Sequence, residues 1–349
     1  MLKSEMSPIV WVNIAICLSV ISINVTFLWT FISDRKISLQ DVESYNPNAT
    51  NASIANSTDW GRMYMAATQD ATIEEEDRPL ILYAYHETEN ARQNALFFVK
   101  HGLHAQADFI FIMNGETSLG LSIPSAPNIK IIQRNNTCFD LGSHAEVLNS
   151  NNGELVEKYK RFILMNASIR GPFLPTWSRE CWSDAYLGKV TDTNKLVGMT
   201  VNCIQPHHIQ SMIFATDRIG VRILLPLISR CFTDILDAVS VEKEATNAII
   251  NAGYNATAMM SAFAGSKNFI ETCDNNDLLF DGAYFGTNIH PYEMIFQKAN
   301  RNIAPKQLEL LTEWHENSGY SSWDVCFKAK KRRDAVRRMK SIGFNVEEI

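Results

Sequence analysis

The chain has 349 residues, of which 46% are apolar and 20% charged, a composition typical of a globular protein. This length allows one large domain or two small ones with a sizeable core. The formal net charge of −6 argues against a general nucleic-acid binder, because no overall basic field attracts phosphate. We therefore expect no nucleic acid among its partners.

The amino-terminal segment is strongly apolar. Residues 9–32 contain no charged residue, and this length spans a lipid bilayer as a helix. A cleaved signal peptide is the alternative, but its apolar stretch would be shorter and a small-residue cleavage site would follow. Here Ser33-Asp34-Arg35-Lys36 follows instead. We expect a transmembrane signal anchor at 9–32 behind a short cytosolic tail at 1–8, with membrane lipid as a partner.

Features after this segment indicate the secretory lumen. By the positive-inside rule, the two cations that follow the span, Arg35 and Lys36, mildly favour placing the residues after it in the cytosol. Glycosylation sequons outweigh this count, and three of them begin at Asn48, Asn51 and Asn56. We expect a single-pass type II protein of the Golgi or endoplasmic reticulum, with residues 33–78 as a polar lumenal stem.

An even number of cysteines follows the span, which predicts disulfides in an oxidising compartment. They are Cys138, Cys181, Cys203, Cys231, Cys273 and Cys326. Scattered buried thiols are the alternative, and the sequence does not choose among the pairings. No Cys-x-x-Cys pair occurs, which argues against a structural zinc site.

From Arg78 onward, short apolar runs alternate with helical periodicity. Strands are predicted at 79–85, 107–113, 129–133 and 161–165, of which the first is an apolar run suited to a buried strand. A helix with Thr88 as N-cap and Gly102 at its end lies between the first two, and another begins near Leu141. This alternation predicts an α/β domain with a mixed, mostly parallel sheet and helices on both faces.

The second half of the domain is mixed. Strands are predicted at 195–203 and 209–217, and helices at 241–254 and 290–301. The tail from Lys328 to Lys340 holds eight Lys or Arg against one Asp, which indicates a solvated helix face or, alternatively, a site for anionic lipid or a partner. We divide residues 79–349 into a first half at 79–175, a second half at 176–305 and a basic helical tail at 306–349.

Polar residues follow the predicted parallel strands where each one ends. In such sheets ligands gather at the carboxyl ends of the strands. The ends carry Tyr85-His86-Glu87, Asn114-Gly115-Glu116, Asn135-Asn136 and Asn166-Ala167-Ser168. Turn chemistry explains any one of them, whereas all four together predict a nucleotide or sugar pocket.

Three segments together resemble the rhamnan synthesis protein F family of glycosyltransferase-like proteins. They are NNTCFDLGSH (135–144), YKRFILMNASIRGP (159–172) and HHIQSM (207–212). The segments LYAYHETENARQNALFFVKHG and HPYEMIFQKANR look like uncharacterised eukaryotic, notably fungal, members of that group. The resemblance covers roughly 80–300. It implies a GT-A-like fold, in which a Rossmann-like nucleotide-binding half joins an acceptor-binding half.

The activity implied by the resemblance is transfer of a sugar from a nucleotide-sugar donor to a glycan or glycoconjugate acceptor. GT-A enzymes commonly hold a divalent cation, Mn²⁺ or Mg²⁺, with an Asp-x-Asp after the fourth strand. This sequence has Asn166-Ala167-Ser168 there, and no Asp-x-Asp occurs in it. Hard cations prefer carboxylate oxygens. The cation therefore stays a candidate cofactor, and we assign no metal ligand.

Donor-binding candidates lie at the strand ends and in the family motifs. They are Tyr85, Glu87, Asn114, Asn136, Asp140, Gly142, Asn166, Ser168, Arg170 and His208. Arg170 offers a planar guanidinium to phosphate, or alternatively braces a turn. Asp140 binds a sugar hydroxyl or simply caps a helix. His208 contacts diphosphate or a metal.

An inverting transfer also needs a base for the acceptor hydroxyl. The candidates are Glu244, Glu293 and Asp217. Asp217 ends a predicted strand, whereas the two glutamates lie on predicted helices, where most carboxylates are simply exposed. Glu293 shares a helix face with His290, which is itself a candidate N-cap before Pro291.

Further sequons begin at Asn135, Asn166 and Asn255. A glycan needs an exposed surface, so we expect one on Asn255 and none on Asn166, which we place in the pocket. The alternative function is a non-catalytic lumenal sugar-binding or accessory protein on the same fold, which the missing Asp-x-Asp favours. A hydrolase ranks last, because neither Gly-x-Ser-x-Gly nor His-Glu-x-x-His is present.

Overall fold

The computed structural model describes residues 78–266, 269–273 and 275–342. The anchor predicted at 9–32, the stem, and the sequons at Asn48, Asn51 and Asn56 lie outside the described residues. Within the described ranges, none of the helices is both long enough and apolar enough to cross a bilayer.

A seven-stranded sheet forms the centre of the domain, in the order β10-β6-β9-β4-β1-β2-β3. Its strands are β1 (Leu80–His86), β2 (Asp108–Asn114), β3 (Ile129–Arg134), β4 (Arg161–Asn166), β6 (Asn194–Gly198), β9 (Ile213–Asp217) and β10 (Asn255–Ala258). Strands β3, β2, β1 and β4 run parallel, as do β6 and β10, while β9 runs antiparallel to both β4 and β6. The mixed, mostly parallel sheet is as predicted.

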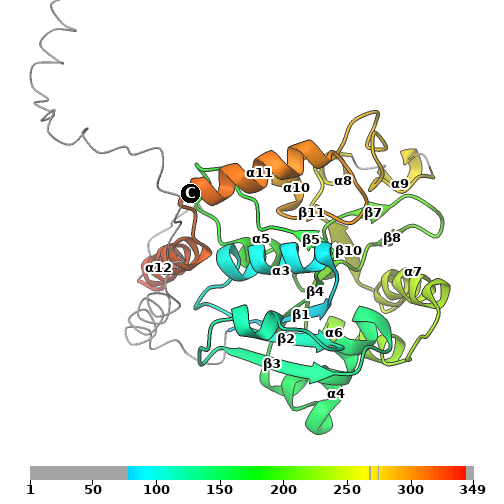
Figure 1. Cartoon of the computed structure of the whole chain (residues 1–349), viewed down its shortest axis with the longest axis horizontal. Helices are drawn as coiled ribbons and strands as arrows, with labels where there is room; N and C mark the ends of the chain where they lie inside the picture. The colour runs from blue at the N-terminus through cyan, green and yellow to red at the C-terminus, as the bar shows by residue number, and fades with distance from the viewer. Residues whose placement is uncertain (1–77, 267–268, 274, 343–349) are drawn as a thin grey trace, which may run out of the picture. The chain divides into compact units, whose positions relative to one another are not determined.

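Helices cover both faces of this sheet, and α3 and α5 lie on the opposite side from α4 and α6 (Figure 1). Their bounds are α3 (Glu89–His101), α4 (Phe139–Lys158), α5 (Trp182–Leu187), α6 (Arg218–Ile228) and α7 (Ile235–Asn251). Because each face is covered, the central strands are apolar throughout, and every residue from Leu80 to Tyr85 is at most 3% exposed.

The residues predicted to begin and end the first helix, α3, are confirmed. The Thr88 hydroxyl accepts from the Ala91 backbone N–H at 3.1 Å, and the Gly102 N–H donates to the Phe98 carbonyl. Phe98 then packs edge-on against Trp182 of α5, with ring centroids 5.6 Å apart. The indole N–H of Trp182 donates to the Gly102 carbonyl at 2.8 Å, so the helix end and the core are joined.

The helix predicted over 290–301 is wrong. Only one turn forms, α10 (Pro291–Met294), with His290 as its N-cap. Ile295 then takes a left-handed backbone, φ 68°, which no helix continues through. The chain enters a short strand, β11 (Gln297–Lys298), which pairs antiparallel with β5 (Ile169–Arg170). This change decides where Lys298 lies.

Other boundaries shift as well. The strand predicted at 195–203 divides into β6 and β7 (Val201–Asn202), and the one at 209–217 into β8 (His208–Ile209) and β9. The tail contains two helices, α11 (Pro305–Asn317) and α12 (Ser322–Ser341). The remaining short elements are η3 (Leu119–Ser122), α8 (Ser261–Gly265) and α9 (Phe269–Thr272).

All six cysteines after the apolar segment form disulfides, which confirms that prediction. The pairs are Cys138–Cys231, Cys181–Cys326 and Cys203–Cys273. Each joins segments at least 70 residues apart in the sequence, which explains why spacing alone did not give the pairing. The first pair fastens the start of α4 to the loop before α7.

Candidate functional site

The parallel strands end at one edge of the sheet. Asn166 at the end of β4 pairs in register with Ala84, and His86 at the end of β1 pairs with Asn114 of β2. Asn114 in turn pairs with Arg134 of β3. The predicted clustering of polar strand ends at one edge is therefore confirmed.

A cavity of about 140 Å³ lies next to the end of β4. Its polar walls come from α4, β4, the loop before β9, α7 and the segment around β11, and comprise Asp140, Asn166, Gln210, Ser211, Glu242, Lys298 and Arg301. Its apolar walls include Phe232, Ile235 and Val239 at the start of α7. Segments from both halves of the domain thus enclose one mixed polar and apolar space.

Hydrogen bonds join Asp140, Asn166, Ser168 and Lys298 in sequence across the end of β4. The Asn166 amide nitrogen donates to the Asp140 carboxylate. The Asn166 amide oxygen accepts from the Ser168 N–H at 3.0 Å and from its hydroxyl at 2.5 Å. The Lys298 ammonium donates to the same hydroxyl at 2.8 Å. Three predicted donor-binding residues are thereby brought together with a lysine that the sequence did not single out.

Glu242 of α7 provides a second carboxylate in the cavity. Its side chain is 16% exposed and accepts from the Ser211 backbone N–H. The Nε2 of His208 lies 4.0 Å from its other oxygen, and His208 Nδ1 contacts the Pro206 carbonyl at 2.8 Å. Burial raises the pKa of Glu242, whereas the Ser211 N–H and His208 act to lower it. The shift favours proton uptake by this carboxylate.

Two cations line the same cavity. Burial, and then the Arg301 guanidinium, lower the pKa of Lys298 to about 8, while Asp140, Glu242 and Asp277 act in the opposite direction. Arg301 is paired with Asp277 at 2.5 Å. Asp277 is itself fixed by the Gln210 amide at 3.2 Å. The positive charge of Arg301 is therefore partly neutralised by Asp277.

Arg170 does not share this cavity. Its guanidinium donates to Asn94 at 2.9 Å, Gln93 at 3.0 Å and Thr312 at 3.4 Å. It lines a separate cavity of about 310 Å³ between α3 and α11. This corrects the expectation that Arg170 and Asn166 face one ligand, because Asn166 at the end of β4 lines the first cavity, whereas Arg170 on β5 lines the second. The alternative role, bracing the turn after β4, matches the contacts.

Asp217 lies at the opposite edge of the sheet. Because β9 runs antiparallel to β4, Asp217 pairs in register with Arg161 at the amino end of β4. It caps α6 by accepting from the Gly220 N–H at 2.9 Å, and it forms an ion pair with buried Lys195 at 2.5 Å. Its predicted role as a catalytic base is corrected, because the strand direction removes it from the cavity.

Neither glutamate predicted as a base lines the cavity. Glu244 is 42% exposed and pairs with Arg230. Glu293 accepts from the Ser261 N–H at 2.9 Å and lies 3.3 Å from the Tyr284 hydroxyl. The prediction that Glu244 and Glu293 act as bases in this cavity is therefore corrected.

The remaining predicted donor-binding residues have structural contacts outside this cavity. Tyr85 is fully buried in β1, and burial, followed by Glu87, raises its pKa to about 12. Glu87 forms an ion pair with Arg92 at 3.0 Å. Asn114 accepts from Arg134 at 2.6 Å, and exposed Asn136 lies 3.5 Å from His86 Nε2. These four belong to the ends of β1, β2 and β3.

Gly142 has a packing role in the first turn of α4. A Cβ on this residue would lie 2.5 Å from the Cys138 Cβ, so a side chain would collide with the Cys138–Cys231 disulfide. Gly142 itself does not line the cavity, whereas its neighbours Asp140 and Leu141 in the first turn of α4 do.

The end of β4 offers no carboxylate to a divalent cation, although Asp140 and Glu242 line the same cavity. Mn²⁺ and Mg²⁺ take oxygen ligands that usually include carboxylates. At the position of the Asp-x-Asp this chain presents an amide and a hydroxyl, and their oxygens already accept from Ser168 and from Lys298. An ammonium beside these oxygens repels a metal ion. We therefore assign no metal to the cavity.

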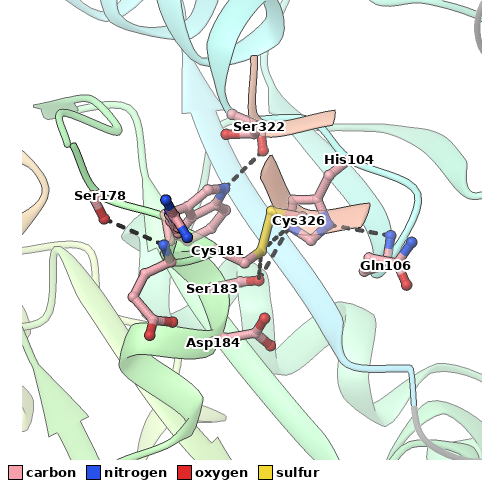
Figure 2. The surroundings of a disulfide bond; sticks show 12 residues. His104, Gln106, Ser178, Cys181, Ser183, Asp184, Ser322 and Cys326 are labelled. Atoms are coloured by element: carbon pink, nitrogen blue, oxygen red, sulfur yellow. Dashed lines mark hydrogen bonds between the residues drawn. A yellow bond between two sulfur atoms is a disulfide. The ribbon is translucent and has the colours of Figure 1, made fainter. Parts of the chain in front are cut away.

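Among the described residues, one cluster of three potential ligands occurs elsewhere, beside the Cys181–Cys326 disulfide (Figure 2). The ligand atoms of His104, Cys181 and Cys326 lie within 4.8 Å of one another. Both sulfurs are bonded to each other, so neither is available as a thiolate for a metal. His104 Nδ1 accepts from the Gln106 N–H at 3.2 Å, and Nε2 lies 3.2 Å from the Ser183 hydroxyl. The cluster is a buried structural contact.

We predict that Asn255 carries a glycan and that Asn166 does not. Asn255 is exposed, whereas the Asn166 amide is bonded to Asp140 and Ser168 in the cavity. A glycan on that nitrogen would displace Asp140. Intact-glycopeptide mass spectrometry of the protein produced in a host that attaches N-linked glycans checks both sites, with Asn255 as the positive control. An oligosaccharide on Asn166 would contradict its assignment to a ligand cavity.

The sequence analysis does not predict three of the charged residues that line the cavity, which are Glu242, Lys298 and Arg301. A signal for Glu242 is present, because it lies on the same helix stripe as Thr246 and Ile249, which are buried. Glu244 lies about 200° away around the helix, on the exposed face. No comparable signal exists for Lys298, since its position depends on the left-handed residue that ends α10.

No family model matches the chain. A search of curated proteins also finds no match. Among solved structures, the mannosyltransferase PcManGT from Pyrobaculum calidifontis, in complex with GDP-Man and Mn²⁺, is similar with a TM-score of 0.36 and 11% identity, over 58% of this chain and 63% of that one.

The glycosyltransferase GlyE from Streptococcus pneumoniae TIGR4 has a TM-score of 0.34 and 6% identity, over 52% of this chain and 45% of GlyE. Its apo form has a TM-score of 0.33 and 6% identity. The chain therefore spans less than two thirds of the length of each of these structures.

Proposed function

We propose that this chain is a glycosyltransferase that moves a sugar from a nucleotide-sugar donor to a glycan or glycoconjugate acceptor. The observation that carries the proposal is the lining of the 140 Å³ cavity at the carboxyl end of β4. There a largely buried carboxylate, a buried ammonium and the polar residues of the family motifs face one space. Open α/β sheets bind ligands at this edge.

The chemistry of transfer assigns a role to each group. A leaving diphosphate needs stabilisation of its growing negative charge, which cations and backbone N–H groups supply. Glu242 takes the proton from the acceptor hydroxyl as that oxygen bonds to the anomeric carbon. The bond from this carbon to the diphosphate breaks, and the diphosphate leaves with the electron pair. Asp140 and Asn166, which line the cavity, accept from and donate to donor hydroxyls in this mechanism.

We further propose a type II membrane protein with its catalytic domain in the Golgi or endoplasmic reticulum lumen. The three disulfides support an oxidising compartment. The apolar residues 9–32 and the sequons that follow them support the orientation.

The alternative is a non-catalytic lumenal sugar-binding or accessory protein. It is favoured by one observation, that Asn166 and Ser168 stand where an Asp-x-Asp would hold a metal.

One experiment separates the two functions. The full-length protein is incubated with a panel of nucleotide sugars, with and without Mn²⁺, and release of free nucleotide is measured. We expect release from at least one donor, faster when a glycan acceptor is added. Sugar binding without nucleotide release from any donor would support the accessory protein and contradict the transferase.

A further inference from the structure

Lys298 is a buried cation that has no ion-pair partner among the residues described by the structure. It is 9% exposed, and its ammonium has one hydrogen bond, to the neutral Ser168 hydroxyl at 2.8 Å. Among the described residues, no carboxylate oxygen lies within the 4.0 Å of an ion pair with it. Buried Lys195, in contrast, pairs with Asp217 at 2.5 Å. A buried ammonium is costly unless an anion compensates it, so Lys298 lacks the partner that Lys195 has.

The Lys298 ammonium contacts one of the residues that stand where a GT-A enzyme would carry its Asp-x-Asp. Ser168 occupies the place of the second carboxylate of an Asp-x-Asp, and the Lys298 nitrogen is bonded to it. The first turn of α4 lines the same cavity, and its N-cap, Cys138, makes no side-chain hydrogen bond to that turn. Unpaired N–H groups at a helix start favour an anion. Two independent features therefore attract negative charge to one place.

We propose that the Lys298 ammonium, in place of a divalent cation, neutralises the diphosphate of a nucleoside-diphosphate-sugar donor. This inference rests on the proposed function. The ammonium and the α4 N–H groups bind the phosphate oxygens, and Arg301 adds positive charge from the cavity wall while paired with Asp277. Phosphate oxygens then supply the anionic partner that Lys298 lacks within the protein.

The protonation of Lys298 makes the affinity depend on pH. The charged groups that face it are Arg301, Asp140, Glu242 and Asp277, and burial lowers its pKa to about 8. Below this pH the amine is charged and binds the diphosphate. Above it the free protein loses the charge, so affinity decreases as pH rises. Phosphate groups are already ionised in this range, so a loss of affinity that disappears when Lys298 is replaced reports on the lysine.

The test uses GDP and UDP as probes and the full-length protein, with binding measured by calorimetry at pH 7. In excess EDTA we expect an affinity within about threefold of that with Mn²⁺, since the ammonium replaces the metal. Binding that requires Mn²⁺ would overturn the inference and leave the proposed function standing. Binding of neither nucleotide in either condition would overturn the proposed function as well.

A pH series and a variant complete the test. In EDTA the wild-type affinity should decrease by about tenfold per pH unit above pH 8, and a constant affinity up to pH 9.5 would overturn the inference. Lys298→Met should weaken binding by about 10- to 100-fold and remove the pH dependence. The control is Lys306→Met, because Lys306 is 73% exposed on α11 and pairs with Glu309. Thermal melting verifies that both variants fold, and equal losses in both would also overturn the assignment.

Discussion

Glu242→Gln should reduce turnover by about 10²- to 10⁴-fold while nucleotide affinity changes by less than about threefold. The amide keeps the shape of the side chain and its contact with the Ser211 N–H, but it cannot take a proton. The measurement is steady-state release of nucleotide in the presence of acceptor, together with calorimetric binding of the same nucleotide. Loss of affinity equal to the loss of turnover would show that Glu242 acts in binding or folding instead.

The matched control is Glu244→Gln on the same helix. Glu244 is 42% exposed and pairs with Arg230, and surface ion pairs contribute little to stability. We expect its turnover within about twofold of wild type.

The pH profile gives a second readout for Glu242. A base with a raised pKa is protonated as pH decreases, so activity should fall on the acidic side in the wild type. The Glu242→Gln variant should lack this acidic limb. An unchanged acidic limb in the variant would assign it to another group.

Replacing Cys138 and Cys231 together by Ala should destabilise the domain by about 2–4 kcal/mol and also weaken nucleotide binding. The disulfide closes a loop of 93 residues in sequence separation, and Cys138 lines the cavity with a left-handed backbone, φ 66°. Without the bond, the first turn of α4, which contains Asp140, is no longer held in a fixed position. Denaturant unfolding and nucleotide calorimetry measure the two effects.

The Cys181–Cys326 disulfide is the control. It closes a longer separation, 145 residues, and neither cysteine lines the cavity at β4. Its double Ala variant should lose a similar amount of stability and keep its nucleotide affinity within about twofold. Equal losses of affinity in both variants would show that the first disulfide has no local effect on the site. Unchanged stability in both would show that these bonds do not form in the mature protein.

The local predictions succeeded where a short stretch contained its own signal. Thr88 and Gly102 mark the limits of α3, and the apolar runs give β1, β2, β3 and β4 nearly to the residue. Buried strands in a covered parallel sheet are apolar throughout, so they are visible in a single sequence. The polar ends of these strands follow from the same pattern.

The residues predicted as catalytic bases do not line the cavity, for two different reasons. The position of Asp217 after a strand predicts a base at the ligand-binding edge, but the strand direction, which depends on pairing with β4, places Asp217 at the opposite edge. Helix periodicity puts Glu244 and Glu242 on different faces of α7, and this difference is visible in the sequence. The first error needed the sheet topology, whereas the second did not.

The α/β class, the strands with their polar ends and the limits of α3 can be predicted from the sequence, as can disulfide formation, because each depends on neighbouring residues or on composition. The pairing of the cysteines, the cavity that Arg170 faces and the contact of Lys298 with Ser168 become visible only in the folded chain. These depend on contacts between segments far apart in the chain; Lys298 and Ser168, for example, are separated by 130 positions. Such contacts are selected by packing of the whole core, which no local stretch of sequence specifies.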